Sequence, residues 1–288
     1  MTVIPVPKKR GRPAKTVQVE TIRSDEEIIN DLSERFSVLG RLTHGAVNGN
    51  IRSLVVSGAP GVGKSFTVEN ILSNSEIPYE IISGGISAVH LYKLGYRMRK
   101  PGSVIVLDDS DAIFTDEEAI NILKAMCDTS SVRKVSWLKD SPTLRQEDDQ
   151  VPTDYDFEGS IIFISNLDFS AYLEENRNKF SQHFEALISR AFYLDLRLHK
   201  RDEIAVWINH VARSANIFLR EGITEDQGNQ ALAFISTYRH QIRVLSIRTL
   251  VHLTKLIKSE PVTWLQTARV TLCRSWQFKV IGYIKWGG

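Results

Sequence analysis

Cysteine is scarce in this sequence, and long apolar runs are absent from it. The two cysteines among the 288 residues are too few for a disulfide framework, and with the seven histidines they show no metal-ligand spacing. No apolar run approaches the roughly 20 residues that span a bilayer, and the N-terminus lacks the apolar core of a secretion signal. We therefore expect a cytoplasmic protein, bacterial or in the host cell if a virus encodes it, with no membrane partner.

The net charge of +2 hides an uneven distribution of charged residues. Residues 1–23 contain six basic residues and one acidic residue, so they carry +5 and residues 24–288 carry −3. This first segment has three prolines and few large apolar side chains, so burial cannot offset the entropy of ordering it. We expect residues 1–23 to be a disordered basic tail.

Within this tail, the stretch "KKRGRPAK" resembles an AT-hook, a short element that binds the minor groove of A·T-rich DNA. Arginine side chains suit the negative potential of that groove, and glycine lets the backbone lie deep in it. An equally open alternative is a solvated basic tail that touches nucleic acid without sequence preference. The candidate DNA-binding residues are Lys8, Lys9, Arg10, Gly11, Arg12 and Pro13.

The stretch "GAPGVGKS" follows an apolar run and has the full G-x-x-x-x-G-K-[ST] spacing of a phosphate-binding loop. Its glycines permit positive φ and let backbone N–H groups face an anion, while Lys64 adds a positive charge. Ser65 offers a hydroxyl to Mg²⁺, and the helix expected after it adds its positive N-terminal end. The predicted nucleotide-binding residues are Gly58, Ala59, Pro60, Gly61, Val62, Gly63, Lys64, Ser65 and Phe66.

Strand and helix patterns alternate after a first helix, which begins at a capping box of Ser24 and Glu27. The pattern predicts an α/β fold with a doubly wound parallel sheet covered by helices on both faces. Functional groups are then expected at the carboxyl ends of the strands. The expected strands are residues 51–57, 79–84, 103–111 and 160–168. One expected helix follows the phosphate-binding loop and ends near residue 72, and two others cover residues 87–99 and 116–128.

Two adjacent carboxylates, Asp108 and Asp109, follow the apolar run "VIVL". One acid at a strand end can hold Mg²⁺ while its neighbour polarises an attacking water. A pair of acids in an ordinary turn is the alternative. Their position after a buried strand, downstream of the phosphate-binding loop, favours the catalytic role.

Together with these motifs, the stretches "IIFISN", "EALISRAFYLDL" and "LSIRTL", in that order, resemble those of AAA+ ATPases from about Ser24 onward. The resemblance implies a P-loop ATPase core over residues 24–198, followed by a small helical lid over residues 199–288. It also implies ATP as the substrate and Mg²⁺ as the cofactor. Finally, it implies a homo-oligomeric ring, expected to be a hexamer, with the nucleotide between neighbouring subunits.

The resemblance also assigns roles to single polar residues. It assigns Asp108 to the metal and places Asp109 where the family usually has a catalytic glutamate. Because aspartate is one methylene shorter, slow turnover is implied. It places Asn166 beside the attacking water, although an asparagine at a strand end can also cap a turn.

Two arginines complete the residues that the resemblance implies. Arg190 resembles the arginine finger that reaches the γ-phosphate of a neighbouring subunit, with Arg177 and Arg197 as rivals. Arg248 resembles the lid arginine that senses nucleotide in its own subunit, with Arg243 as its rival. For either role, an ordinary surface arginine on an amphipathic helix is the alternative.

Strand signals fade after residue 199, and four lid helices are expected over residues 200–215, 224–240, 245–257 and 261–276.

Two other segments bear on what the protein acts upon. The stretch "HLYKLGYRMRK" sets Tyr92 and Tyr96 among basic residues, where the family often lines a central pore; a plain amphipathic helix with a solvated basic face is at least as well supported. The polar residues 132–159 form either a functional loop or an insertion.

The favoured function is ATP-driven remodelling of DNA or of a DNA-bound complex, as in helicase loaders and in replication or partition factors. One alternative is a protein unfoldase, which Tyr92 and Tyr96 suggest. The other is a nucleotide-gated binding switch with little hydrolysis, which Asp109 suggests. A protein partner is possible in each case.

Overall fold

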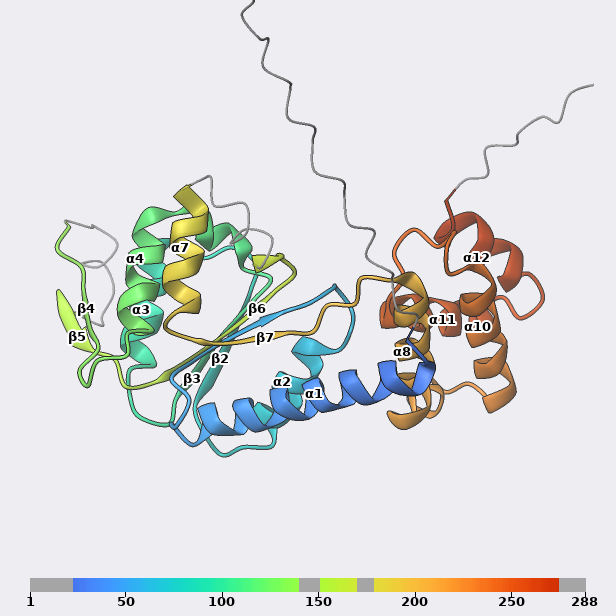
Figure 1. The fold of residues 1–288 in the computed structure, drawn as a ribbon, viewed down its shortest axis with the longest axis horizontal. Helices are drawn as coiled ribbons and strands as arrows, with labels where there is room; N and C mark the ends of the chain where they lie inside the picture. Colours follow the sequence, from blue (N-terminus) through green and yellow to red (C-terminus); the bar gives the residue numbers. More distant parts are fainter. Residues whose placement is uncertain (1–22, 140–150, 170–178, 275–288) are drawn as a thin grey trace, which may run out of the picture.

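The computed structural model describes residues 23–139, 151–169 and 179–274. A core built on a parallel sheet lies beside a group of helices that forms the C-terminal region (Figure 1). The expected α/β fold with a following helical region is therefore confirmed. We call the second region, from residue 201 to residue 274, the lid.

The core sheet has five strands, and every neighbouring pair in it is parallel. The three middle strands are buried along almost their whole length, because helices cover both faces and each strand is nearly continuous in apolar residues. All five carboxyl ends therefore lie along one edge of the sheet. In spatial order the strands are β2 (Tyr79–Ser83), β3 (Val104–Asp108), β6 (Ser160–Ser165), β1 (Ser53–Ser57) and β7 (Phe192–Asp195).

Helices lie on both faces of this sheet, as Figure 1 shows. Successive strand residues point to opposite faces, so Leu54, Val106 and Ile162 pack on one side while Val55 and Phe163 pack on the other. The first face is covered by α1 (Asp25–Val47) and α2 (Lys64–Ser73). The second is covered by α3 (Ala88–Arg97), η1 (Asp111–Thr115), α4 (Glu117–Met126) and α7 (Lys179–Ile188).

The lid has its own apolar core, separate from the two layers of the sheet. Its helices are amphipathic, and a capping box of Thr224 and Gln227 fixes the start of one of them. The helices are α8 (Arg201–Ser214), α9 (Ile217–Glu221), α10 (Glu225–Tyr238), α11 (Ile247–Ser259) and α12 (Trp264–Leu272). The four expected helices are present, and α9 is additional, set off by left-handed Asn216 (φ 50°) and Gly222 (φ 65°).

The long helix α1 contacts both regions. Near its N-terminus, Ile28 and Leu32 pack against Trp207 of α8. Farther along, Leu39 and Ala46 belong to the apolar layer on the sheet. The core and the lid therefore share one continuous helix in addition to the connecting chain.

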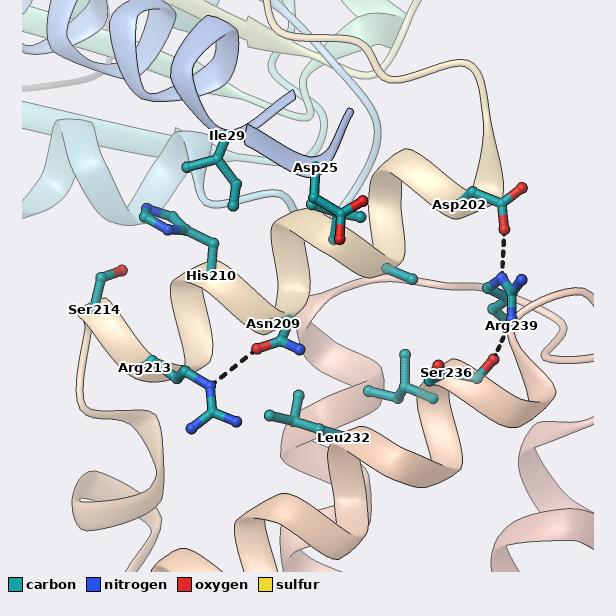
Figure 2. Close-up of a pocket in the computed structure, with 13 residues that line it drawn as sticks. Asp25, Ile29, Asp202, Asn209, His210, Arg213, Ser214, Leu232, Ser236 and Arg239 are labelled. Carbon is teal, nitrogen blue, oxygen red and sulfur yellow. Dashed lines mark hydrogen bonds and ion pairs between the residues drawn. The ribbon is translucent and has the colours of Figure 1, made fainter. Parts of the chain in front are cut away.

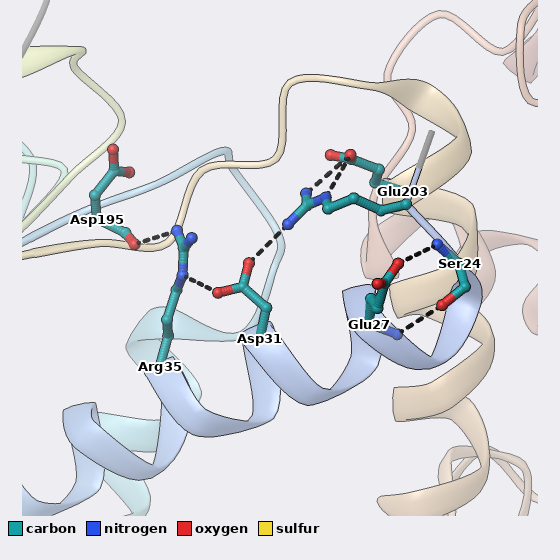
Figure 3. A network of polar contacts seen from close by, with 7 residues as sticks. Ser24, Glu27, Asp31, Arg35, Asp195 and Glu203 are labelled. Carbon is teal, nitrogen blue, oxygen red and sulfur yellow. Dashed lines mark hydrogen bonds and ion pairs between the residues drawn. The ribbon is translucent and has the colours of Figure 1, made fainter. Parts of the chain in front are cut away.

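A polar network fastens the start of α1 to both regions (Figure 3). Arg23 forms ion pairs with Asp31 at 2.9 Å and with Glu203 of α8 at 2.8 Å. Asp31 also pairs with Arg35 at 2.9 Å, and Arg35 donates to the carbonyl of Asp195 at the end of β7. Arg23, which the sequence groups with the basic tail, thus belongs to the folded structure.

Several elements differ from the sequence expectations. The strand expected over residues 103–111 ends at Asp108, because Asp109 adopts φ 51° and turns the chain into η1. The short strand β7 was not expected. Within residues 132–159, β4 (Lys134–Ser136) and β5 (Asp154–Asp156) pair in antiparallel fashion, which was not expected either.

The possible pore-lining role of Tyr92 is wrong. Tyr92 is fully buried, because it lies on the inner face of α3, and its hydroxyl donates to the carbonyl of Pro152. Its ring packs against Tyr155 of β5 with centroids 5.0 Å apart. Lys93 is also buried, whereas Arg97 is exposed and pairs with Glu80. Of the two aromatic side chains considered for stacking on a substrate, Tyr92 is therefore part of the core.

Candidate nucleotide site

The glycine-rich loop joins the end of β1 to the start of α2. Gly61 (φ 70°) and Gly63 (φ 113°) adopt the left-handed conformation that favours glycine, and Lys64 is the first residue of α2. The Lys64 ammonium group donates to the carbonyls of Gly58 (2.6 Å) and Ala59 (3.0 Å). The side chain of Lys64 is only 5% exposed.

Burial shifts the titration of this lysine. It lowers the pKa of Lys64 to about 8, although the charges of Asp109 and Asp108 act in the opposite direction, and the positive charge of Arg248 lowers the pKa further. An anion placed in the loop would favour the charged form of Lys64.

Asp108 lies at the end of β3 beside the loop. Burial raises the pKa of its carboxyl group, while a hydrogen bond from the Ser65 side chain and the charge of Lys64 oppose that shift. The carboxylate and hydroxyl oxygens of this pair are the kind of ligand that Mg²⁺ takes. No group of three or more His, Cys, Asp or Glu side chains that could hold a metal occurs within the described ranges. This small donor set fits a magnesium ion that takes its other ligands from phosphates and water.

Asn166 connects the lysine to the second acid. Its side-chain oxygen accepts from the Lys64 ammonium group at 3.0 Å, and its side-chain nitrogen donates to Asp109 Oδ1 at 2.5 Å. Asp109 is exposed and left-handed, and its backbone N–H donates to the carbonyl of Ile164 on β6. A non-glycine residue with positive φ is uncommon, and such residues cluster at functional sites.

A third acid, Asp111, lies behind Asn166 and was not predicted. Its carboxylate accepts from the Ser165 hydroxyl at 2.7 Å. Burial, together with the charge of Asp109, raises the pKa of Asp111. Asp111 belongs to the run of acids in "LDDSDA", of which only Asp108 and Asp109 were predicted to have roles.

These groups surround a cavity of about 310 Å³ between the core and the lid. The core contributes Pro60, Gly61, Gly63, Lys64, Ser65, Phe66, Asp108, Asp109 and Asn166. The lid contributes Val211, Ala215, Ile217, Arg220, Glu221, Ile247, Arg248 and Val251. The structure therefore brings together most of the predicted loop, both acids, the asparagine and the predicted lid arginine.

The remaining loop residues play supporting parts. Gly58 and Ala59 supply carbonyls to Lys64, and Val62 is buried with its carbonyl accepting from the Trp207 indole at 3.2 Å. The lid makes a second contact with the loop, from the backbone N–H of Ile247 to the carbonyl of Gly61 at 3.0 Å. This contact places Arg248, the next residue, beside the cavity.

The rival lid arginine lies elsewhere. Arg243 donates to the carbonyl of Thr271 at 3.2 Å and lines a neighbouring hollow instead of this cavity. The apolar lid wall was not predicted, because nothing in the sequence sets its small aliphatic residues apart from core residues. Arg220, also not predicted, lies 5.0 Å from the ring centroid of Phe66.

Arg190 is not part of this cavity. It precedes β7, its carbonyl accepts from Ser53 at the start of β1, and its side chain lies 3.6 Å from Asp128. It therefore lies at the amino edge of the sheet, opposite the loop. Of its rivals, Arg197 forms ion pairs with Asp195 and with Asp168 in the same chain, and Arg177 lies outside the described residues.

A larger hollow, of about 850 Å³, opens between the start of α1, α8 and α10 (Figure 2). It contains none of the predicted site residues. Its polar side chains are largely engaged with each other, as Arg213 with Asn209 and Arg239 with Asp202. The smaller cavity, where the loop and the acids are, is therefore the candidate nucleotide site.

Two expectations concern other parts of the chain. The AT-hook-like residues 8–13 lie outside the described residues. No helix in the described ranges is long and apolar enough to cross a membrane.

Comparison with known proteins gives one relative with substantial sequence identity. An uncharacterised 36.7 kDa protein from the nrdC–mobD intergenic region of Enterobacteria phage T4 is 35% identical over 257 residues, which cover 88% of this chain and 78% of that protein. No protein-family model matches the chain. The solved structures include the RuvB Holliday junction branch migration motor of Thermotoga maritima, with 14% identity and a TM-score of 0.47 over 86% of this chain and 69% of that one. They also include Drosophila ORC bound to DNA, with 13% identity and a TM-score of 0.44 over 85% and 67%.

Proposed function

We propose that this chain, which belongs to the same family as the 36.7 kDa phage T4 protein, is an AAA+ protein and a Mg²⁺-dependent ATPase that acts on DNA or on a DNA-bound complex. The observation that carries the ATPase proposal is the chain of contacts from Lys64 through Asn166 to Asp109. These contacts lie beside Ser65 and Asp108, in the cavity that the lid residue Arg248 also lines. A plain phosphate-binding loop would not need the two acids and the asparagine.

Each of these residues has a part in the proposed hydrolysis. Lys64 and the backbone N–H groups of the loop bind the phosphates, and Arg248 adds positive charge from the lid. Bound Mg²⁺ would be held by Ser65 and Asp108 and would neutralise developing phosphate charge. Asp109 orients the attacking water and takes up its proton.

Asn166 changes its partners in this proposal. In the described structure its amide oxygen accepts from Lys64 while its amide nitrogen donates to Asp109. When a triphosphate binds, Lys64 turns to the phosphates, and the Asn166 amide is free to hold the water near Asp109. This exchange links the filling of the site to the release of the acid that promotes hydrolysis.

The DNA part of the proposal is supported by the distribution of charge. Residues 241–274 carry six basic residues and one acidic residue, a net charge of +5, while residues 24–240 carry −10. The six basic side chains are exposed on the lid. Such a concentration of positive charge suits a phosphate backbone, as does the basic segment before residue 23. The basic residues of this segment are Arg243, Arg248, Lys255, Lys258, Arg269 and Arg274.

The decisive test is the ATPase rate with and without DNA, at low salt, for the intact chain, two variants and a control. The intact chain should be stimulated by DNA, and deletion of residues 1–20 or the double change Lys255→Glu and Arg274→Glu should weaken the stimulation. A Lys134→Glu variant, altered at an exposed lysine in the core, is the matched control. No Mg-ATP binding would refute the ATPase proposal, and normal ATPase with no DNA binding at low salt would refute only the DNA part.

A second candidate, a nucleotide-gated switch with little hydrolysis, is favoured by one observation. Asp109 is short for its role and is already hydrogen-bonded to Asn166 at 2.5 Å. Single-turnover hydrolysis separates the two functions, because a switch would bind Mg-ATP tightly and hydrolyse it no faster than a Lys64→Ala control. Assembly into a ring, in which Arg190 would serve a neighbouring subunit, belongs to both candidates.

A further inference from the structure

Asp111 does not line the nucleotide cavity, yet its carboxylate is bonded to the segment that carries Asn166. One oxygen accepts from the hydroxyl of Ser165, which is 1% exposed, at 2.7 Å. This contact crosses from η1, after β3, to the last residue of β6, which directly precedes Asn166.

The turn at residues 165–167 is otherwise fixed by neutral hydrogen bonds. The Ser165 hydroxyl accepts from the backbone N–H of Leu167 at 3.0 Å, and the carbonyl of Leu167 accepts from the Ser57 hydroxyl at 2.6 Å. The carbonyl of Ser165 accepts from the N–H of Gly58 at 3.2 Å. Asp111 supplies the ionisable acceptor in this set, and hydrogen bonds to a charged group are stronger than neutral ones.

The Asn166 side chain depends on this turn for its position. Its two polar atoms reach Lys64 and Asp109 from a residue that is itself exposed, so no surrounding packing holds the amide in place. A small rotation of the turn would move the amide away from both partners. Misplacement of a catalytic group by about 1 Å can cost as much as a hundredfold in rate.

We propose that Asp111 is a positioning residue for ATP hydrolysis, which fixes the Ser165–Asn166 turn so that the Asn166 amide faces Lys64 and Asp109. This inference rests on the proposed ATPase function. It predicts a defect in turnover and not in nucleotide binding, because the loop and Lys64 are untouched.

The first experiment needs no activity. Hydrogen exchange of the free full-length protein should show faster exchange of the Asn166 and Leu167 amides in Asp111→Ala than in the wild type. Asp116→Ala is the control, because Asp116 lies five residues later and only caps α4, through the N–H groups of Glu118 and Ala119. Unchanged exchange at Asn166 in Asp111→Ala would overturn the inference.

The second experiment separates positioning from general destabilisation. We expect kcat of Asp111→Ala to fall roughly tenfold or more, with the Kd for Mg-ATP changed less than about threefold. In an Asn166→Ala background, the same substitution should lower kcat by less than about twofold, because the two residues act as a unit. Equal loss in both backgrounds, or wild-type kcat in Asp111→Ala, would overturn the inference.

Milder variants keep the test decisive if Asp111→Ala does not fold. Asp111→Asn retains one acceptor oxygen for the Ser165 hydroxyl, and Ser165→Ala removes that hydroxyl, so both should give a smaller loss of kcat. A wild-type chain without ATPase activity would overturn the proposed function and this inference together. A wild-type chain that hydrolyses ATP, with both mild variants unaffected, would overturn the inference alone.

Discussion

Lys64 is a cation held in a buried place, and its titration should be visible in nucleotide binding. Burial lowers its pKa to about 8, and a bound triphosphate needs the protonated form. Below pH 8 the free protein already carries this proton, so affinity should be flat. Above pH 8 binding must take up a proton, so affinity should fall by up to about tenfold per pH unit.

This prediction is checked by the Kd of Mg-ATP between pH 7 and pH 9.5 at constant ionic strength. Lys134→Ala, at an exposed lysine paired with Asp154, should keep the wild-type profile. An affinity that stays constant over the whole range would contradict the assignment of Lys64 as the phosphate-binding cation.

Asp109 should affect turnover more than binding. Asp109→Asn removes the carboxylate that takes the proton from water, and we expect kcat to fall roughly a hundredfold while the Kd for Mg-ATP changes less than about threefold. Asp109→Glu lengthens the side chain by one methylene, to the glutamate that AAA+ ATPases usually have, and should raise kcat. Single-turnover hydrolysis and nucleotide titration on the same samples measure both quantities. If Asp109→Asn turned over at the wild-type rate, the general base would have to be another residue.

At the scale of elements, the lid is fastened to the glycine-rich loop through Trp207. Its indole donates to the Val62 carbonyl at 3.2 Å and stacks on Phe36 with centroids 5.1 Å apart. Trp207→Phe keeps an aromatic ring but removes the donor, so we expect a loss of about 0.5–1.5 kcal/mol in the free energy of unfolding. Affinity for Mg-ATP should also fall, because the loop loses one of its hydrogen bonds with the lid.

Urea unfolding and nucleotide titration measure these two effects. Trp264→Phe is the matched control, since Trp264 packs against Phe234 inside the lid and does not touch the loop. If both variants weakened nucleotide binding equally, the Trp207 contact would have no specific role in the site.

Elements of the core were predictable where the apolar pattern was strong and uninterrupted. The runs "SLVVS", "VIVLD" and "SIIFIS" form buried middle strands, as their composition indicates. The strand β7 was missed because it has only four residues and begins two residues after the Arg190 turn. The pair β4–β5 was missed because only its middle residues, Val135 and Tyr155, are buried.

The site was predictable to the extent that each residue type had a chemical reason to stand where it does. The loop, the two acids and Asn166 follow strands whose ends must meet at one edge of a parallel sheet. Asp111 and Arg220 could not be found in this way, because their contacts depend on how η1 and α9 are placed in space. For Tyr92 the sequence left two positions open, because an aromatic residue among basic ones can point toward a pore or into the core.

At the scale of the whole molecule, Arg190 and the cavity lie on opposite edges of the sheet. If Arg190 acts in hydrolysis, it must act on another copy of the chain. Arg190→Ala and Lys64→Ala should each be nearly inactive alone, and a mixture of the two should regain part of the activity. At some interfaces of the mixture, the intact loop of an Arg190→Ala subunit then faces the intact Arg190 of a Lys64→Ala subunit.

The ATPase rate of mixtures, measured against mixing ratio, tests this arrangement. Arg52→Ala is the control, because Arg52 lines a hollow together with Arg190, and it should retain activity by itself. A mixture that never exceeds the sum of its parts would argue that hydrolysis does not use Arg190 from a neighbour.

The helix α1 has a mechanical consequence for the motion of the lid. This helix is continuous over 23 residues. Leu39 holds it in the sheet layer, Ile28 and Leu32 hold it on the lid side, and its capping box stabilises its first turn. A lid joined only by a linker could swing at little cost. Here, separation of the lid from the core must either break the contact of α1 with Trp207 or bend α1. The observed arrangement of the lid and the core should therefore resist opening.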